Sequence, residues 1–521
     1  MVRLWGIDYG LPCTYCRPDE DRLISTALRL SLEDPNPHYF IWPGLFFYST
    51  RGILEAATLV RRVAGGIAGG SSADLYRDDP AYFHLILRYI FCGFGVATVY
   101  LLGLLGKRLF SPRVGLLSAF FLALSFLHVR DSHFAMLDIP ATLLAVGFFL
   151  SAWSVYSRGR WGDYLRAGAV LGLAVATKYY AVLLAVPLIT AHLSRSSPDR
   201  AGFRRLLSAL ALGAVLFALA SPYTFLDAAS FAREIKDGIM APQFVDGFHL
   251  LPGLETARGW LYHITFSLRY GMGWPLELLA LAGVGYGVWR MIGGKVPERL
   301  ILSFFLIFYL ALSFQKPCFI RYTMLLLPFL YLLGAALLAR VAPRRAGGGF
   351  LLVLAALLVV LEPAVRIVRL DGLLSRTDTR LTAGTWMREN IAPESVVIFP
   401  QPKIFGRPAG YFRYPRRIIL AGNDEAGALR DLVSAPFAGK KYAVVSEHPL
   451  AYSRLKPEIK KLLGEMSDSS HTITGDRVSS TGAVYDPFDA FYVPVAGFRG
   501  VDAPGPTIRI YDLIRFVDKS D

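Results

Sequence analysis

Long apolar runs joined by short basic linkers constrain the fold of this chain more than any other feature of its sequence. The runs are about 17 to 25 residues long, the length that an α-helix needs to cross the hydrocarbon core of a bilayer. Hydrophobic residues make up 54% of the 521 residues, and the mean hydropathy is +0.42. The sequence therefore predicts a polytopic membrane protein whose fold is mainly α, a helical bundle.

The distribution of charge assigns each connection to one side of the membrane. A net charge of +15 could indicate a nucleic-acid surface, but Lys and Arg gather in short linkers between the apolar runs. Basic residues mark every other connection, which is the positive-inside pattern of cytoplasmic loops. We therefore expect no nucleic-acid partner, and we place the other connections on the external side.

This alternation predicts about ten membrane helices. The expected spans are residues 82–105, 114–129, 139–156, 165–177, 179–193, 206–221, 275–291, 300–314, 323–340 and 350–367. The external side then receives residues 1–80, 130–138, 222–274 and 315–322, the turn at Lys178 and the chain after about residue 370. All the unusual polar residues lie on that side.

Three regions follow from this pattern: a first external loop (1–80), a transmembrane domain (81–370) and an external soluble domain (371–521). In the last region, short apolar runs alternate with polar helical stretches, which predicts a small α/β domain. Strands are expected at residues 395–399, 417–420, 442–445 and 507–511, and helices at 380–390, 425–434 and 454–466.

Four cysteines give no disulfide framework. Cys92 and Cys318 lie in or beside apolar runs, where a cysteine acts as a small hydrophobic residue. Cys13 and Cys16 form a C-x-x-C without a second pair, whereas a structural zinc site needs about four ligands. A disulfide between these two in an exported region stays open.

The external polar residues fit the transfer of a sugar from a lipid phosphate. A hydroxyl is a weak nucleophile, so a carboxylate must accept its proton as the new bond forms, and Asp19 is the candidate for this base. A phosphate leaving group needs cations to hold its charge. Lys178, Lys316 and Arg321 lie on the required side.

Four short motifs follow one another along the chain, all on the external side of the membrane. They are Pro18-Asp19-Glu20, the segment from His133 to Pro140, Thr177-Lys178, and Arg321-Tyr322. In these motifs the chain resembles the polyprenyl-phosphate-dependent glycosyltransferases of the C-type fold over roughly residues 3–340. It is similar to the dolichyl-phosphate-mannose protein mannosyltransferases and to the lipid A aminoarabinose transferases.

The resemblance implies roles for individual residues. Asp19 corresponds to the catalytic base and Asp138 to a second acidic residue of the site, while Lys178 and Arg321 correspond to the residues that grip the lipid phosphate. Tyr322 directly follows Arg321 and Lys316 lies five residues before it, and both are included in the expected phosphate site.

Other candidates have two interpretations each. Glu20 could place the acceptor or act as a charge at a helix start, and Asp138 could serve only as an N-cap. His38 and Tyr48 could shape a sugar pocket or anchor the loop at the interface. His133 could orient the substrate or pack as a buried polar group. Snorkelling is the structural alternative for the basic residues.

The expected function is a membrane glycosyltransferase, inverting, that moves a hexosyl or pentosyl group at the external face of a bacterial plasma membrane. Its partners would be a polyprenyl-phosphate sugar, membrane lipids, and a protein, lipid or glycan acceptor. No cofactor is certain from the sequence, and metal dependence stays open, because Asp19, Glu20 and Asp138 could share a divalent cation but offer no fixed ligand spacing. One alternative is a ligase for diphosphate-linked oligosaccharides, and another is a transporter or flippase. Transporters place ionisable residues at mid-membrane, whereas the charged residues here gather at one face.

The start of the chain carries a separate expectation. An external C-terminal domain after ten spans also places Met1 outside, so the first external loop would have to cross without a signal peptide. Members of the resembling family begin with a helix directly before the segment that matches Arg3 to Tyr9. We therefore expect an in-frame apolar stretch of ~20 residues upstream in the genomic DNA; a stop codon directly before Met1 would contradict this.

Overall fold

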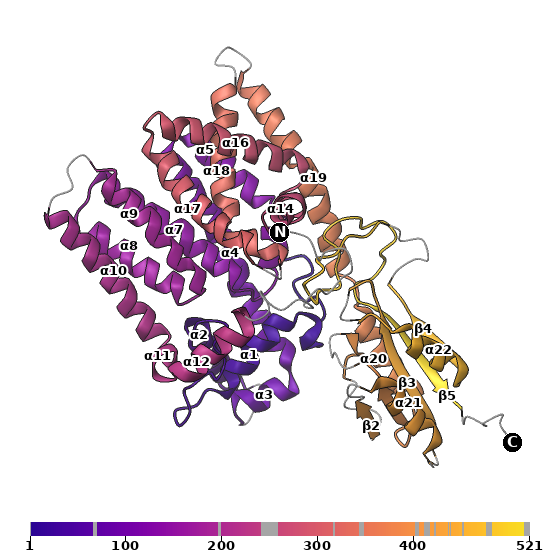
Figure 1. Ribbon diagram of the computed structural model, residues 1–521. Coiled ribbons are helices and arrows are strands. Elements are labelled where there is room, and N and C mark those ends of the chain that lie inside the picture. Colours follow the sequence, from indigo (N-terminus) through magenta and orange to yellow (C-terminus); the bar gives the residue numbers. More distant parts are fainter. Residues whose placement is uncertain are drawn as a thin grey trace.

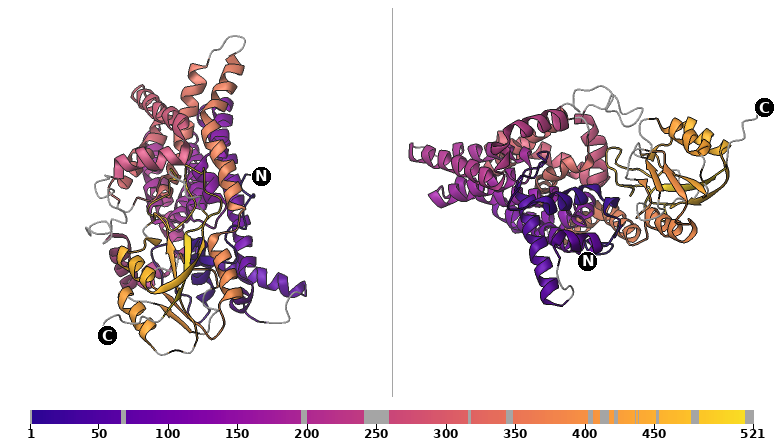
Figure 2. Two further views of the ribbon diagram at one scale, coloured as in Figure 1. Left: turned by 90° about the vertical axis from the view of Figure 1, so that its right-hand side faces the viewer. Right: turned by 90° about the horizontal axis from the view of Figure 1, so that it is seen from below.

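The computed structural model describes residues 2–65, 70–195, 200–240, 259–315, 318–342, 348–401, 406–410, 417–420, 424–435, 437, 439–450, 453–475 and 482–514. Figure 1 shows a bundle of long helices with a small sheet domain at its lower right. The right-hand view of Figure 2 shows this domain beside the bundle. The fold class expected from the sequence, a membrane helical bundle with a small α/β domain, is confirmed.

The bundle consists of long helices and of shorter or broken ones. Its elements are α4 (Pro80–Leu109), α5 (Pro112–Ala123), α6 (Phe126–Ser132), α7 (Asp138–Ser157), α8 (Trp161–Val175), η2 (Tyr179–Leu184), α9 (Ala185–Leu193), α10 (Arg200–Ala220), α16 (Trp274–Ile292), α17 (Val296–Ser313), η5 (Ile320–Leu326), α18 (Leu327–Val341) and α19 (Gly348–Leu374).

Six helices of the described residues are long and apolar enough to cross a membrane, and α5 with α6 makes a seventh if that bent pair is one span. The remaining expected spans fall on α8, on η2 with α9, and on α16. The chain is a multi-pass membrane protein.

Local sequence signals start several of these helices. Asp79 caps α4 by accepting a hydrogen bond from the Tyr82 amide (3.3 Å), and Pro80 fills the first helical position, where an amide proton is not needed. Ser111 caps α5 in the same way. After α5 the chain bends by 59° into α6. All seven residues of α6 are buried, so the bend brings polar side chains inside the bundle.

Short helices gather at one end of the bundle, at the bottom of Figure 1. They include η1 (Thr14–Cys16), α1 (Pro18–Arg29), α2 (Leu45–Val63), α3 (Ser72–Asp78), α11 (Tyr223–Leu226) and α12 (Ala228–Glu234). Apolar side chains of α1, α2 and α3 form a second core with the start of α4. Further along the chain come η3 (Ile235–Met240), α14 (Gly259–Tyr262), η4 (His263–Leu268) and α15 (Arg269–Met272).

The soluble domain contains a five-stranded sheet in the order β2-β1-β3-β5-β4. Its strands are β1 (Val396–Phe399), β2 (Arg417–Leu420), β3 (Lys441–Glu447), β4 (Ser467–Ile473) and β5 (Thr507–Leu513). β1 pairs with β2 and β3 in parallel, and β5 pairs with β3 and β4 antiparallel.

Helices cover both faces of this sheet. Alternate side chains of β1 and β3 pack against α21 (Glu425–Ser434) and α22 (Pro457–Glu465) on one face, and against α20 (Thr379–Asn390) on the other. The four strands and three helices expected from the sequence are confirmed. β4 was missed, because this edge strand is Ser-Asp-Ser-Ser-His-Thr-Ile and most of its side chains are exposed.

The connection between β4 and β5 returns to the bundle. Phe491, Val493, Val495, Phe498 and Val501 are buried in the same hydrophobic core as the membrane helices. The soluble domain is thereby packed onto the end of the bundle where the short helices lie.

Candidate functional site

Asp19 stands in the first turn of α1, directly after Pro18 at the helix start. Its Oδ2 lies 3.0 Å from Nη2 of Arg321. Arg321 belongs to η5, the 3₁₀ turn that opens the α18 span. The Asp19 side chain keeps 29% of its surface exposed, against 11% for Arg321. The structure thus brings the expected base and an expected phosphate-binding residue into one ion pair, and leaves the carboxylate accessible.

Asp138 forms a second cluster at the start of α7. Its Oδ1 accepts a hydrogen bond from the Tyr180 hydroxyl (2.9 Å), and Nζ of Lys178 lies 3.4 Å from Oδ2. Lys178 is also 5.9 Å from the centre of the Trp42 ring. Two sequence candidates therefore meet here, one at the start of α7 and one in the turn between α8 and η2.

Tyr322 lies near both ion pairs. The residue follows Arg321 in η5, and its hydroxyl is affected by the charges of Arg321, Asp138 and Asp19. Because η5 packs against α7, both carboxylates and both cations face one region between the first loop and the bundle. The role of Tyr322 in binding the phosphate stays a prediction.

Glu20 adjoins Asp19 in the sequence but faces the interior. Its carboxylate is fully buried, 2.6 Å from Nη2 and 3.0 Å from Nε of Arg88 on α4, and it accepts a hydrogen bond from the Ala135 amide (2.8 Å). Burial opposes ionisation, but the Arg88 charge and the hydrogen bonds outweigh it and lower the pKa of Glu20 to about 2. These contacts tie α1 to α4 and to the segment before α7.

A third cluster surrounds Asp489, on the connection between β4 and β5. Both of its oxygens accept hydrogen bonds from Nη1 of Arg17, at 2.9 and 2.8 Å. Nη1 of Arg321 lies 3.3 Å away and Nη2 of Arg130 lies 3.9 Å away. Arg130 also pairs with its neighbour Asp131 at 2.8 Å.

None of the residues in this third cluster except Arg321 was a firm candidate from the sequence. Asp489 is 472 positions from its partner Arg17, so spacing gives no signal for the pair. Arg130 and Asp131 are completely or almost completely buried, and an ionisable pair flanked by apolar residues in a membrane protein is a signal that could have found them.

The structure places the remaining sequence candidates in other contacts. His38 is exposed in the loop between α1 and α2 and pairs with Asp34 (3.0 Å), while the hydroxyl of Tyr48 on α2 donates to the Pro35 carbonyl of that loop (3.2 Å). The His133 ring is buried, with its nitrogens 2.9 and 3.2 Å from backbone carbonyls. Their assignment to a sugar pocket stays a prediction, and Lys316 lies outside the described residues.

The acidic side chains do not converge on one another. Asp19, Glu20 and Asp138 each pair with a different cation, and the described residues contain no group of three His, Cys, Asp or Glu side chains placed to hold a metal ion. Cys13 and Cys16 are buried and free. A divalent cation in the site stays a prediction.

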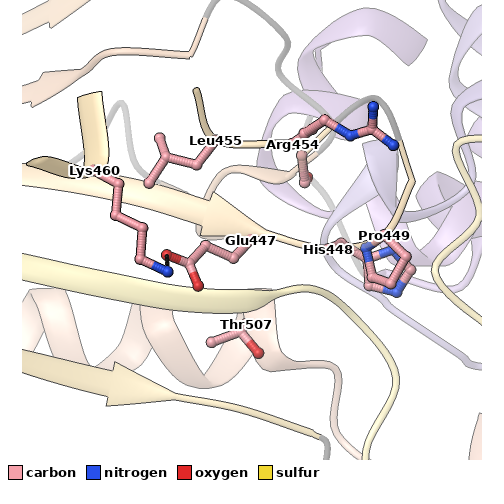
Figure 3. Close-up of a pocket in the computed structure, with 8 residues that line it drawn as sticks. Glu447, His448, Pro449, Arg454, Leu455, Lys460 and Thr507 are labelled. Carbon is pink, nitrogen blue, oxygen red and sulfur yellow. Dashed lines mark ion pairs between the residues drawn. The ribbon is translucent and has the colours of Figure 1, made fainter. Parts of the chain in front are cut away.

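A separate hollow of about 380 Å³ lies on the soluble domain, lined by Glu447, His448, Pro449, Ser453, Arg454, Leu455, Lys460 and Thr507. Figure 3 shows the Lys460 ammonium pointing toward the Glu447 carboxylate, 3.9 Å away. None of these residues belongs to the three clusters above.

Comparison with known proteins supports the fold. The family model described as dolichyl-phosphate-mannose-protein mannosyltransferase matches residues 85–225. No curated protein matches the chain in sequence.

Solved structures are similar over almost the whole chain. ArnT from Cupriavidus metallidurans in the apo state gives a TM-score of 0.52 at 15% identity, covering 98% of this chain and 95% of that one. ArnT bound to undecaprenyl phosphate gives 0.52 at 14%, covering 98% and 96%. The Archaeoglobus fulgidus oligosaccharyltransferase in the apo form gives 0.51 at 13%, covering 96% and 85%. The resemblance expected from the sequence is confirmed, and the chain has the fold of the C-type glycosyltransferases.

Proposed function

We propose that this protein is a membrane glycosyltransferase that moves a sugar from a polyprenyl-phosphate donor to an acceptor hydroxyl. The observation that carries the proposal is the Asp19–Arg321 ion pair, which joins an accessible carboxylate to a guanidinium beside the Asp138–Lys178 cluster. A similar fold in a protein whose structure contains undecaprenyl phosphate supports the choice of donor.

Asp19 acts as the general base in this proposal. It accepts the acceptor's hydroxyl proton while the acceptor oxygen bonds to the anomeric carbon. The bond from that carbon to the phosphate oxygen breaks in the same step, and the polyprenyl phosphate leaves with the electron pair. A single displacement of this kind inverts the anomeric centre.

Arg321 and Lys178 hold the charge of the phosphate. Because Arg321 pairs with the base at 3.0 Å, a phosphate bound to the same guanidinium would lie next to Asp19, and the anomeric carbon would be within its reach. Asp138 orients Lys178, and the Tyr180 hydroxyl fixes Asp138. Glu20, which is held by Arg88, keeps α1 in position.

We further propose that the site faces the external side of a bacterial plasma membrane. The positive-inside pattern of the linkers supports this orientation. The short helices α1, α2 and α3 and the soluble domain lie toward the lower end of the bundle in Figure 1, and Asp19, which pairs with Arg321, belongs to α1.

A panel of radiolabelled polyprenyl-phosphate sugars tests the function. Membranes that contain the protein are expected to move the label of at least one donor from the lipid to an acceptor. A diphosphate-linked oligosaccharide arm tests the ligase alternative. Label that crosses the bilayer while still attached to its lipid would identify a flippase and contradict the proposal.

Removing either phosphate-binding cation should weaken donor use. Each charge-assisted contact in a site shielded from water is worth ~1.5 to 3 kcal/mol, so Lys178→Ala or Arg321→Ala should lower kcat/KM for the donor about tenfold or more. Arg321→Lys should restore only part of it, because a point charge does not reproduce a planar fork. Steady-state kinetics at varied donor concentration measures this.

Arg77→Ala is the matched control. Arg77 pairs with Asp74 at 3.2 Å on α3, and 75% of its side chain is exposed, so its removal leaves no buried charge behind. It should behave as wild type. Unchanged donor kinetics in both the Lys178 and the Arg321 variants would remove these residues from the site.

A further inference from the structure

The carboxylate of Asp489 joins the soluble domain to the proposed transfer site. It forms a continuous ionic chain in which Arg17 contacts Asp489 at 2.8 Å, Asp489 contacts Arg321 at 3.3 Å, and Arg321 contacts Asp19 at 3.0 Å. Arg17 lies just before Pro18, where α1 begins, and Asp19 lies in its first turn. Both ends of this series of ion pairs are therefore at the start of α1. Asp489 thus bridges the start of α1 and η5 from outside the bundle.

The segment that carries Asp489 is firmly embedded. The carboxylate of Asp486 accepts hydrogen bonds from the amides of Ile320 (3.1 Å) and Phe488 (3.2 Å), and Ile320 is the first residue of η5. The Arg17 guanidinium lies 4.7 Å from the centre of the Phe491 ring, which is 2% exposed. A segment held at both sides of Asp489 cannot be withdrawn easily, so this carboxylate is a fixed part of the site.

The two carboxylates of this segment differ in ionisation. Burial and the charge of Asp489 raise the pKa of Asp486. For Asp489, burial is outweighed by the charges of Arg17, Arg321 and Arg130, which lower its pKa. Asp489 is therefore the anion of the pair, and Asp486 serves as the hydrogen-bonding anchor of the segment.

The arginines need this anion. Arg17 and Arg130 are each 1% exposed, and a buried guanidinium without a counter-charge is strongly unfavourable. Arg130 has a second ion-pair partner in Asp131, and Arg321 has one in Asp19. Among the described residues, the carboxylate that pairs with Arg17 is that of Asp489. Without Asp489, Arg17 would compete with Arg321 for Asp19, two residues further along the chain.

We propose that Asp489 is a positioning residue of the transfer site: it holds Arg17 away from Asp19 and fixes Arg321 toward both the base and the donor phosphate. This inference rests on the proposed function. It makes the soluble domain a structural part of the site, because the domain supplies a carboxylate that the bundle lacks at this point among its described residues.

The test combines Asp489→Asn with Arg321→Ala in the full-length protein. Misplacing a reacting group by about 1 Å costs up to ~10²-fold in rate, so Asp489→Asn should lower kcat/KM for the donor ~10- to 100-fold with the acceptor KM unchanged. In the Arg321→Ala background the same change should lower it by less than about threefold, since residues of one ionic network are non-additive.

Asp512→Asn is the matched control, because Asp512 pairs with Lys440 (2.9 Å) on the same domain and takes part in none of the three clusters. It should leave transfer unchanged. If the losses in kcat/KM of Asp489→Asn and Arg321→Ala simply multiply in the double variant, the inference is overturned and a general loss of folding is indicated. Wild-type transfer by Asp489→Asn would also overturn the inference.

Hydrogen exchange gives a readout that does not depend on catalysis. Amide protection of α1 and η5 should fall in Asp489→Asn and not in Asp512→Asn, and unchanged protection would overturn the inference. A wild-type protein that transfers no sugar from any donor tested would instead contradict the proposed function, and the exchange experiment would still decide the role of Asp489.

Discussion

Replacement of Asp19 by asparagine is expected to lower the rate of sugar transfer by ~10² to 10⁴, the usual contribution of a positioned base. Asparagine keeps the size of the side chain and can still accept a hydrogen bond from Arg321, 3.0 Å away. Donor binding should therefore stay nearly intact while turnover falls. Donor affinity and transfer rate, measured separately on the purified protein, test this.

Asp21→Asn is the control for this substitution. Asp21 lies in the same helical turn but accepts a hydrogen bond from the Tyr76 hydroxyl (3.1 Å) in place of an arginine contact. It should transfer sugar at close to the wild-type rate. If both variants behave alike and mildly, Asp19 is an ordinary loop charge, and near wild-type transfer by Asp19→Asn ends its assignment as the base.

Most of the fold could be predicted because membrane spans and buried strands depend on local composition. Apolar length located the helices, and basic linkers ordered them. The edge strand β4 was not predictable in this way, because its residues are polar and its pairing with β5 joins segments about 40 positions apart. Edge strands take their conformation from the neighbouring strand.

The site was predictable only in part, for a related reason. Asp19, Asp138, Lys178 and Arg321 could be selected by residue type and sidedness, and the structure pairs them. Nothing local in the sequence indicates that the proposed base, Asp19, would share Arg321 with a carboxylate of the soluble domain, Asp489. Partner choice among buried charges is decided by the tertiary fold.

Glu20 illustrates this point most clearly. Its neighbour Asp19 has the same charge and lies in the same helical turn, yet Asp19 faces the accessible region and Glu20 faces α4. Successive helical residues point about 100° apart, so one of two adjacent acids can be exposed while the other is buried. The sequence could not decide which of the two would meet Arg88.

The Glu20 contacts also predict a pH dependence of stability. The pKa of Glu20 is about 2 in the folded protein, below the value of about 4.3 for an unfolded glutamate. A lowered pKa contributes stability that is fully present above about pH 4.3 and is lost as the pH falls toward about 2. Above that window the ion pair with Arg88 holds α1 on α4.

Arg88→Met is expected to destabilise the protein by roughly 3 to 5 kcal/mol, because it leaves the Glu20 charge buried without its cation. The apolar part of the side chain is largely preserved, so the loss of charge dominates. Thermal unfolding in detergent at neutral pH should show a large fall in Tm. The double variant Glu20→Gln/Arg88→Met removes the stranded charge and should recover part of this loss.

Arg88→Met should also lose the decline in stability between about pH 4.3 and 2, since Glu20 would already be protonated there. Unchanged stability of Arg88→Met, or a double variant less stable than the single one, would show that this ion pair does not hold α1 in place.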